Sequence, residues 1–152
     1  MNQNNMNQNN MNENNNYIDM FKLLKNHDWE LFKKKLNNLD EDFDINLRDD
    51  QNEYLLTYAV LYNRMDIIQL LIDKNAKIDI IDNEERSILY ICIKYGYIDI
   101  IKYLIDKNKN SIGINILDIK DKLHKISLHY AIQKKNINII NILLEAGSNQ
   151  NI

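Results

Sequence analysis

The chain has 152 residues and a formal charge of −3 at pH 7, which accommodates one domain with a continuous core and gives no global bias toward nucleic acid or anionic membrane. Its apolar runs are far shorter than the roughly 20 residues of a membrane span, so we expect none. The single cysteine, Cys92, cannot form an internal disulfide. This favours a reducing compartment, and we expect a cytoplasmic location with the nucleus as an open alternative.

The first sixteen residues, MNQNNMNQNNMNENNN, repeat a five-residue phrase and carry almost no apolar surface apart from methionine. Such a composition predicts a disordered, Asn/Gln-rich, low-complexity tail over residues 1–16. A self-association tail is one interpretation. A slippage product of an AT-rich coding sequence is the interpretation that the general abundance of Asn, Ile, Lys and Tyr favours.

Residues 17–44 begin with YIDMFKLLKNHDWELFKKKLNN, which reads as a degenerate repeat that caps the units after it. Glu30, Leu31 and Phe32 align with the later Asp66, Ile67 and Ile68, whereas lysines 33–35 replace apolar residues. Polar residues suit a terminal unit with one face in water. The alternative is that these lysines, with Lys22 and Lys25, contact phosphates.

Three later blocks superimpose without a gap: EYLLTYAVLYNRMDIIQLLIDK, RSILYICIKYGYIDIIKYLIDK and KISLHYAIQKKNINIINILLEA. They start at Glu53, Arg86 and Lys125, so a 33-residue unit recurs with six extra residues before its last copy. A period of this length indicates a solenoid of stacked helix pairs. In such an architecture each unit leaves an apolar face that only its neighbour can cover.

The apolar pattern within each block predicts two packed helices. From Ile67, Ile100 and Ile139 the apolar residues fall at i, i+1, i+3, i+4 and i+5, which gives the second helix a wide apolar face. The first helix supplies the cover at three positions per unit: Leu56, Ala59 and Val60, then Leu89, Cys92 and Ile93, then Leu128, Ala131 and Ile132. The small middle residues predict close approach of the two helices.

The blocks resemble ankyrin repeats, through YLLTYA, SILYIC and ISLHYA in the first helix and DIIQLLI, DIIKYLI and NIINILL in the second. The hairpin segments NLRDDQN, DIIDNEE and NILD place Asp49, Asp82 and Asp118 at equivalent sites. The resemblance covers residues 17–152 and implies an all-α ankyrin-repeat solenoid with repeats at 45–78, 79–114 and 115–152. The hairpin-tip glycine of the family is replaced by Asn52 and Glu85, and the third tip reads as lengthened by about three residues around IKDKLH.

Residues that could carry chemistry are few. His124 and His129 lie five positions apart, and no carboxylate or cysteine completes a metal-binding pattern. The resemblance implies a structural hydrogen-bonding role for His129, and Cys92 fits a packing position between helices. There is no glycine-rich phosphate loop or Gly-x-Ser-x-Gly motif. We therefore expect a monomeric protein that is not an enzyme and that has no cofactor or metal.

The resemblance implies that a partner protein meets the concave face formed by the hairpin tips and the exposed edge of the first helices. Carried over position by position, this selects Asp50, Gln51, Glu53, Leu61, Tyr62, Asn83, Glu84, Arg86, Lys94, Tyr95, Lys125, Gln133 and Lys134. Their charge grades from acidic at the first hairpin to basic at the third. The leading hypothesis is a protein-interaction module, acting as an adaptor or competitive binder. The alternative is nucleic-acid or nucleoprotein binding through the lysine-rich cap.

Overall fold

The structure, a computed structural model, describes residues 19–39, 43–109 and 114–148. The tail predicted over residues 1–16 lies outside this range. The helices are α2 (Trp29–Asn37), α3 (Leu55–Leu61), α4 (Met65–Asp73), α5 (Ile88–Tyr95), α6 (Ile98–Lys109), α7 (Ser127–Gln133) and α8 (Ile137–Glu145), and residues 19–25 are helical as well. Extended pairing in the described residues is limited to two isolated antiparallel bridges at the bases of hairpins. The all-α prediction is confirmed.

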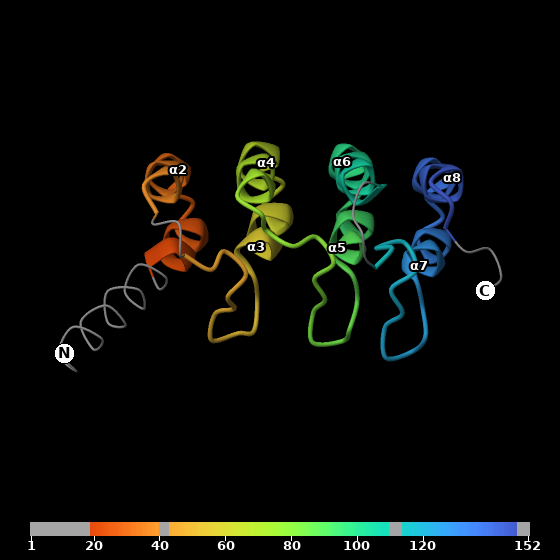
Figure 1. The fold of residues 1–152 in the computed structure, drawn as a ribbon. Coiled ribbons are helices and arrows are strands. Elements are labelled where there is room, and N and C mark those ends of the chain that lie inside the picture. Colours follow the sequence, from red (N-terminus) through yellow and green to blue (C-terminus); the bar gives the residue numbers. More distant parts are fainter. Residues whose placement is uncertain (1–18, 40–42, 110–113, 149–152) are drawn as a thin grey trace.

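The helix pairs stand side by side in one row (Figure 1). Helices α3, α5 and α7 form one layer, in which α5 contacts both of its neighbours. Helices α2, α4, α6 and α8 form the other, and each of α4, α6 and α8 packs on the first helix of its own unit. The three hairpins project from the same edge of the row (Figure 1). This is the stacked helical solenoid that the repeats predict.

The hairpins correct one alignment of the sequence analysis. The backbone N–H of Asp49 donates to the carbonyl of Glu53 at 2.9 Å, and Asp121 donates to Lys125 in the same way at 3.0 Å. Asp82 makes the middle copy of this contact, to Arg86 at 3.1 Å. The third equivalent residue is therefore Asp121, and the prediction of Asp118 was wrong. The third hairpin is as long as the others, and the extra six residues all lie before it.

The tips of the hairpins take the left-handed backbone conformation that a glycine would favour. Asn52 has φ of 65°, Glu85 of 61° and His124 of 58°. Asn enters this region readily, whereas a longer side chain such as Glu does so at a cost of about 1 kcal/mol or more. Asn52 and Glu85 thus hold the backbone conformation that a glycine at the tip would favour.

One side of each second helix packs against the preceding unit. Ile67, Ile100 and Ile139 are equivalent and are buried in their three units. Leu31, at the same position of the first described unit, is 42% exposed. Four positions later, on the same side of the helix, the residue is a buried leucine in the three full units: Leu71, Leu104 and Leu143. In the first described unit it is a half-buried lysine, Lys35. Burial is lost only in the first described unit, so we infer that this side of the second helices faces the preceding unit.

The residues one position later in each second helix face the following unit. Ile68 and Ile101 are buried, as is Phe32 of the cap, but the equivalent Ile140 is only half-buried. The first helices behave alike: Val60 and Ile93 are buried, whereas Ile132 is 48% exposed. Ile132 is thus less buried than its predicted role in covering the second helix of its unit implies. Its side chain occupies a position that covers the next unit, and it is the last described copy.

Close packing of the two helices within each unit depends on small residues. Ala59, Cys92 and Ala131 are fully buried, as the sequence predicts. Burial raises the pKa of the Cys92 thiol to about 12, so the thiol is neutral at physiological pH and acts as an apolar group. Leu56, Leu89 and Leu128 are also buried and complete the interface.

The direction of stacking predicts different costs for one substitution at two equivalent sites. Ile101→Ala removes side-chain atoms enclosed on both sides and is expected to cost about 2–5 kcal/mol of unfolding free energy. Ile140→Ala, at the half-buried equivalent, is expected to cost less than half as much, because water already reaches part of the side chain. Urea unfolding followed by circular dichroism measures both. Equal losses would contradict the assignment of these residues to the following unit.

Candidate functional site

Each hairpin is organised by an aspartate side chain at its base. The Oδ1 atom of Asp49 accepts the backbone N–H groups of Gln51 and Glu53, both at 3.0 Å. Its Oδ2 atom accepts the Tyr58 hydroxyl at 2.7 Å and pairs with the Lys25 ammonium at 2.8 Å. Because Lys25 belongs to the cap and Tyr58 to α3, this one carboxylate joins cap, hairpin and helix.

The other two hairpins repeat this arrangement with different partners. Asp82 Oδ1 accepts the backbone N–H groups of Glu84 at 2.8 Å and Arg86 at 2.9 Å, and its Oδ2 accepts the Arg86 Nε at 2.7 Å. Asp121 Oδ1 accepts the N–H groups of Leu123 and Lys125, both at 2.8 Å. Its Oδ2 accepts the Tyr130 hydroxyl. Each tip is therefore held from within, and its outward side chains are not needed to close the turn.

The environment of these carboxylates favours their charged form. Burial alone would raise the pKa of Asp49, but the Lys25 ammonium and the hydrogen bonds from Glu53, Tyr58 and Gln51 hold it below its usual value. The pKa of Asp121 is lowered in the same way against the effect of burial. Burial and the adjacent carboxylate raise the pKa of the two phenols, Tyr58 and Tyr130, to about 12. At neutral pH the tyrosines are donors and the aspartates are acceptors.

Neighbouring tips contact one another and form a continuous edge. The Asn52 side-chain amide donates to Asn83 Oδ1 at 2.7 Å. The backbone N–H of Lys122 donates to the Glu84 carbonyl at 3.1 Å, and the two side chains approach to 3.7 Å. We define the hairpin edge as residues 50–53, 83–86 and 122–125 together with the ends of the first helices at 61–62, 94–95 and 133–134.

The structure brings the predicted partner-binding residues onto this edge but exposes them unequally. The exposed ones are Asp50, Gln51, Asn83, Glu84, Lys94, Tyr95, Gln133 and Lys134. The half-buried ones are Glu53, Leu61, Tyr62, Arg86 and Lys125. Arg86 lies with its guanidinium 4.0 Å from the centre of the Tyr90 ring, so much of its surface is used inside the unit.

Tyr62, one of the predicted partner-binding residues, is engaged in contacts within the protein. Its ring lies 4.5 Å from His27 and 5.6 Å from Trp29 in edge-on contacts. The Arg64 guanidinium covers the Trp29 ring at 4.4 Å. Tyr62 thus braces the cap against the first full unit, and its substitution would disturb stability as well as any surface. Tyr95, the equivalent residue of the next unit, is 48% exposed and stacks on Tyr97 at 5.6 Å.

Two exposed residues of the third tip are absent from the predicted partner-binding set. Lys122 and Leu123 occupy the third tip, and Leu123 is 70% exposed. An alignment with Asp118 as the hairpin aspartate leaves both residues outside the tip, whereas Asp121 makes the hairpin contact to Lys125. The available signal was the four-residue spacing from aspartate to the start of each block: Asp49 to Glu53, Asp82 to Arg86, and Asp121 to Lys125.

The lysines proposed as a phosphate-binding surface are largely paired with carboxylates of the protein. Lys33 lies 2.7 Å from Asp66 and 3.1 Å from Glu30, and Lys35 lies 2.8 Å from Asp19. Lys25 is engaged by Asp49. These pairs join the cap helices to each other and to α4, and they offset the positive charge that a nucleic acid would require.

The remaining candidates have structural roles. His129 Nδ1 accepts the backbone N–H of Ile126 at 3.1 Å, so its predicted hydrogen-bonding role is confirmed. In the described part of the chain, no three His, Cys, Asp or Glu side chains gather in a way that could hold a metal ion. Among the helices described, none is both long enough and apolar enough to cross a membrane.

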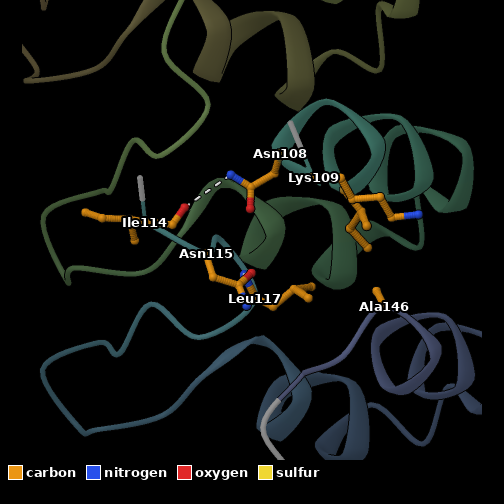
Figure 2. A pocket seen from close by; sticks show the side chains of 7 residues that line it. Asn108, Lys109, Ile114, Asn115, Leu117 and Ala146 are labelled. Carbon is orange, nitrogen blue, oxygen red and sulfur yellow. Dashed lines mark hydrogen bonds between the residues drawn. The ribbon is translucent and has the colours of Figure 1, made fainter. Parts of the chain in front are cut away.

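A hollow of about 250 Å³ lies between α6, residues 114–117 and the end of α8. Figure 2 shows the Asn108 amide at its rim, donating to the Ile114 carbonyl at 3.1 Å. The same amide accepts the backbone N–H of Ile116 at 3.1 Å. Asn46 makes the corresponding contacts to residues 75–77 one unit earlier. The hollow therefore lies where the Asn108 side chain, at the end of α6, binds the backbone of residues 114–116 across the insertion.

The hairpin carboxylate predicts a pH-dependent difference between two neighbouring substitutions. Asp49→Asn removes a buried, charged acceptor and is expected to cost about 1–3 kcal/mol at pH 7, whereas Asp50→Asn alters an exposed carboxylate and is expected to cost little. Because the folded pKa of Asp49 is below the unfolded one, its contribution is present above about pH 4 and is lost as pH falls below that value. The gap between wild type and Asp49→Asn should narrow toward pH 2 in urea titrations. A gap that stays constant would contradict this account.

Comparison with known proteins agrees with the geometry. Residues 10–118 match the family described as ankyrin repeats in three copies. An ankyrin repeat protein of Acanthamoeba polyphaga mimivirus is 33% identical over 133 residues, which cover 87% of this chain and 17% of that relative. Ankyrin repeats are a non-enzymatic fold and generally serve as protein–protein interaction modules. The repeated helix pairs, the aspartate-based hairpins and these matches together show that the chain belongs to the ankyrin repeat family.

Proposed function

We propose that this chain is a non-enzymatic adaptor or competitive binder that holds a partner protein on its hairpin edge. A comparison of the repeats with one another supports this most strongly. Buried positions keep their character in each unit, as in Leu56, Leu89 and Leu128. Equivalent tip positions diverge, reading DQNE at 50–53, NEER at 83–86 and KLHK at 122–125. The fold constrains the first set, and the second is available for recognition.

The edge also offers apolar surface for an interface. Tyr95 and Leu123 are large apolar side chains that lie exposed at the surface, and they belong to adjacent units. Tyrosine contributes a large contact area at a small loss of side-chain entropy, and the Lys94 ammonium lies 5.2 Å from the centre of the Tyr95 ring. These residues are the anchors that we assign to the interface, with the charged tip residues around them.

A double substitution tests this proposal. Tyr95→Ala with Leu123→Ala removes both exposed anchors. The wild-type chain is used to capture its partner from an extract of the native cell, and mass spectrometry identifies that partner. We expect the double variant not to capture it. The purified partner should then bind the variant at least tenfold more weakly in calorimetry. Unfolding free energy should change by no more than about 0.5 kcal/mol, because neither side chain is buried.

The matched control is Leu31→Ala, which removes an apolar side chain of similar exposure from the outer face of α2. It should leave capture unchanged. Retention of the partner by the double variant would reject the hairpin edge as the binding surface.

A further inference from the structure

The charges of the hairpin edge form a gradient along the row of units. The first tip carries Asp50 and Glu53, and the third carries Lys122 and Lys125. The middle tip mixes Glu84 and Glu85 with Arg86. The edge therefore changes from acidic to basic in the direction of the chain.

The ends of the first helices repeat the gradient independently. The first unit has uncharged Leu61 and Tyr62, and the second has Lys94 beside Tyr95. The third has Gln133 followed by exposed Lys134 and Lys135. The hairpin tips and the ends of the first helices, which differ in sequence and in local structure, thus both have their positive charge in the third unit.

At the acidic end, carboxylates outnumber the cations that could neutralise them. Lys25 is held by Asp49 at 2.8 Å and lies 3.8 Å from Asp50, whose side chain is 86% exposed. Glu53 is half-buried beside two hairpin aspartates. Burial and, less strongly, Asp82 and Asp49 raise its pKa, against a hydrogen bond from Thr57 and the charge of Arg48. A positive charge brought by a partner would relieve this repulsion.

At the basic end, the acidic residue of the hairpin is turned inward. Asp121 is buried against the Tyr130 hydroxyl and two backbone N–H groups, so it does not face a partner. Lys122 is 3.7 Å from Glu84 and remains half exposed. Exposed Lys122 and half-buried Lys125 lie close to exposed Leu123 in the chain, and Lys134 and Lys135 are exposed just after α7.

We propose that the partner contributes an extended peptide segment of opposite gradient, with basic side chains over the first hairpin, acidic side chains over the third and an apolar side chain against Leu123. This inference rests on the proposed function. Adjacent helices pack about 10 Å apart, so the outer hairpins are separated by about 20 Å. An extended chain spans that distance with about six residues. The two charged blocks of the segment are therefore about six residues apart.

Other occupants fit the edge less well. A nucleic acid is negative along its whole length and would be repelled at the first hairpin. A second copy in antiparallel orientation would match the charges, but it would place Leu123 against the acidic first tip. A peptide with separate basic and acidic blocks satisfies both charged ends and the apolar contact.

The experiment uses fluorescein-labelled peptides and the full chain. Two probes carry four lysines and four glutamates separated by a six-residue Ser/Leu spacer, one in each block order. A third has the same composition with alternating charges. In anisotropy titrations, one block order should bind at least tenfold more tightly than the alternating peptide, and added salt should weaken it.

Charge reversal locates the interaction. Lys122→Glu with Lys125→Glu should reduce binding of the preferred block peptide at least tenfold. The control Lys34→Glu with Lys102→Glu makes the same charge change on exposed lysines of α2 and α6 and should have a much smaller effect. Equal binding of block and alternating peptides, or equal effects of the two double variants, would overturn the inference.

Three other outcomes would also overturn it. They are tighter binding of a single-stranded oligonucleotide than of the block peptide, a dimer that the Lys122→Glu and Lys125→Glu changes dissociate, and full capture of the native partner by that variant. In the last case, loss of capture by the Tyr95→Ala and Leu123→Ala variant would show that the hairpin edge still binds the partner. The proposed function would then stand while the charge assignment would fail.

Discussion

The structure depends on directional packing between successive helix pairs. One row of each second helix, represented by Ile67, Ile100 and Ile139, fits against the unit before it, and the adjacent row, represented by Ile68 and Ile101, fits against the unit after it. Each inner unit is thus covered from two sides, and the first and last described units are covered from one side by described residues. Stability in such an array is a sum of unit terms and nearest-neighbour interface terms. The exposed Leu31 and Ile132 at opposite ends follow from this arrangement.

The hairpin aspartates connect this packing to recognition. Asp49, Asp82 and Asp121 each satisfy backbone N–H groups of their own tip, while a tyrosine or arginine ties the carboxylate to its unit. Since closure of the turn is achieved from within, the outward side chains are free of that task. The tips can then differ in charge from unit to unit without a change in backbone conformation, and a graded surface becomes compatible with a repeated fold.

Periodicity predicted most of the fold because burial repeats with the units. The second helices and the small buried residues at 59, 92 and 131 were readable from spacing and residue type. Two kinds of feature were not. The helix and hairpin patterns left the insertion open to placement on either side of residues 114–120, and the hydrogen bonds of Asp121 within its own hairpin place it before residue 121. The half-buried state of Tyr62 depends on His27 and Trp29, which come from a cap that shares little sequence with the other units.

Hydrogen exchange of the intact chain, followed residue by residue, tests the directional stacking most directly. A backbone amide exchanges when the unit that contains it unfolds locally, and units covered on both sides unfold least often. The account therefore predicts the slowest exchange in α4, α5 and α6, and faster exchange in α8 and in the helix at 19–25. Uniform protection along the row, or slowest exchange in α8, would contradict it.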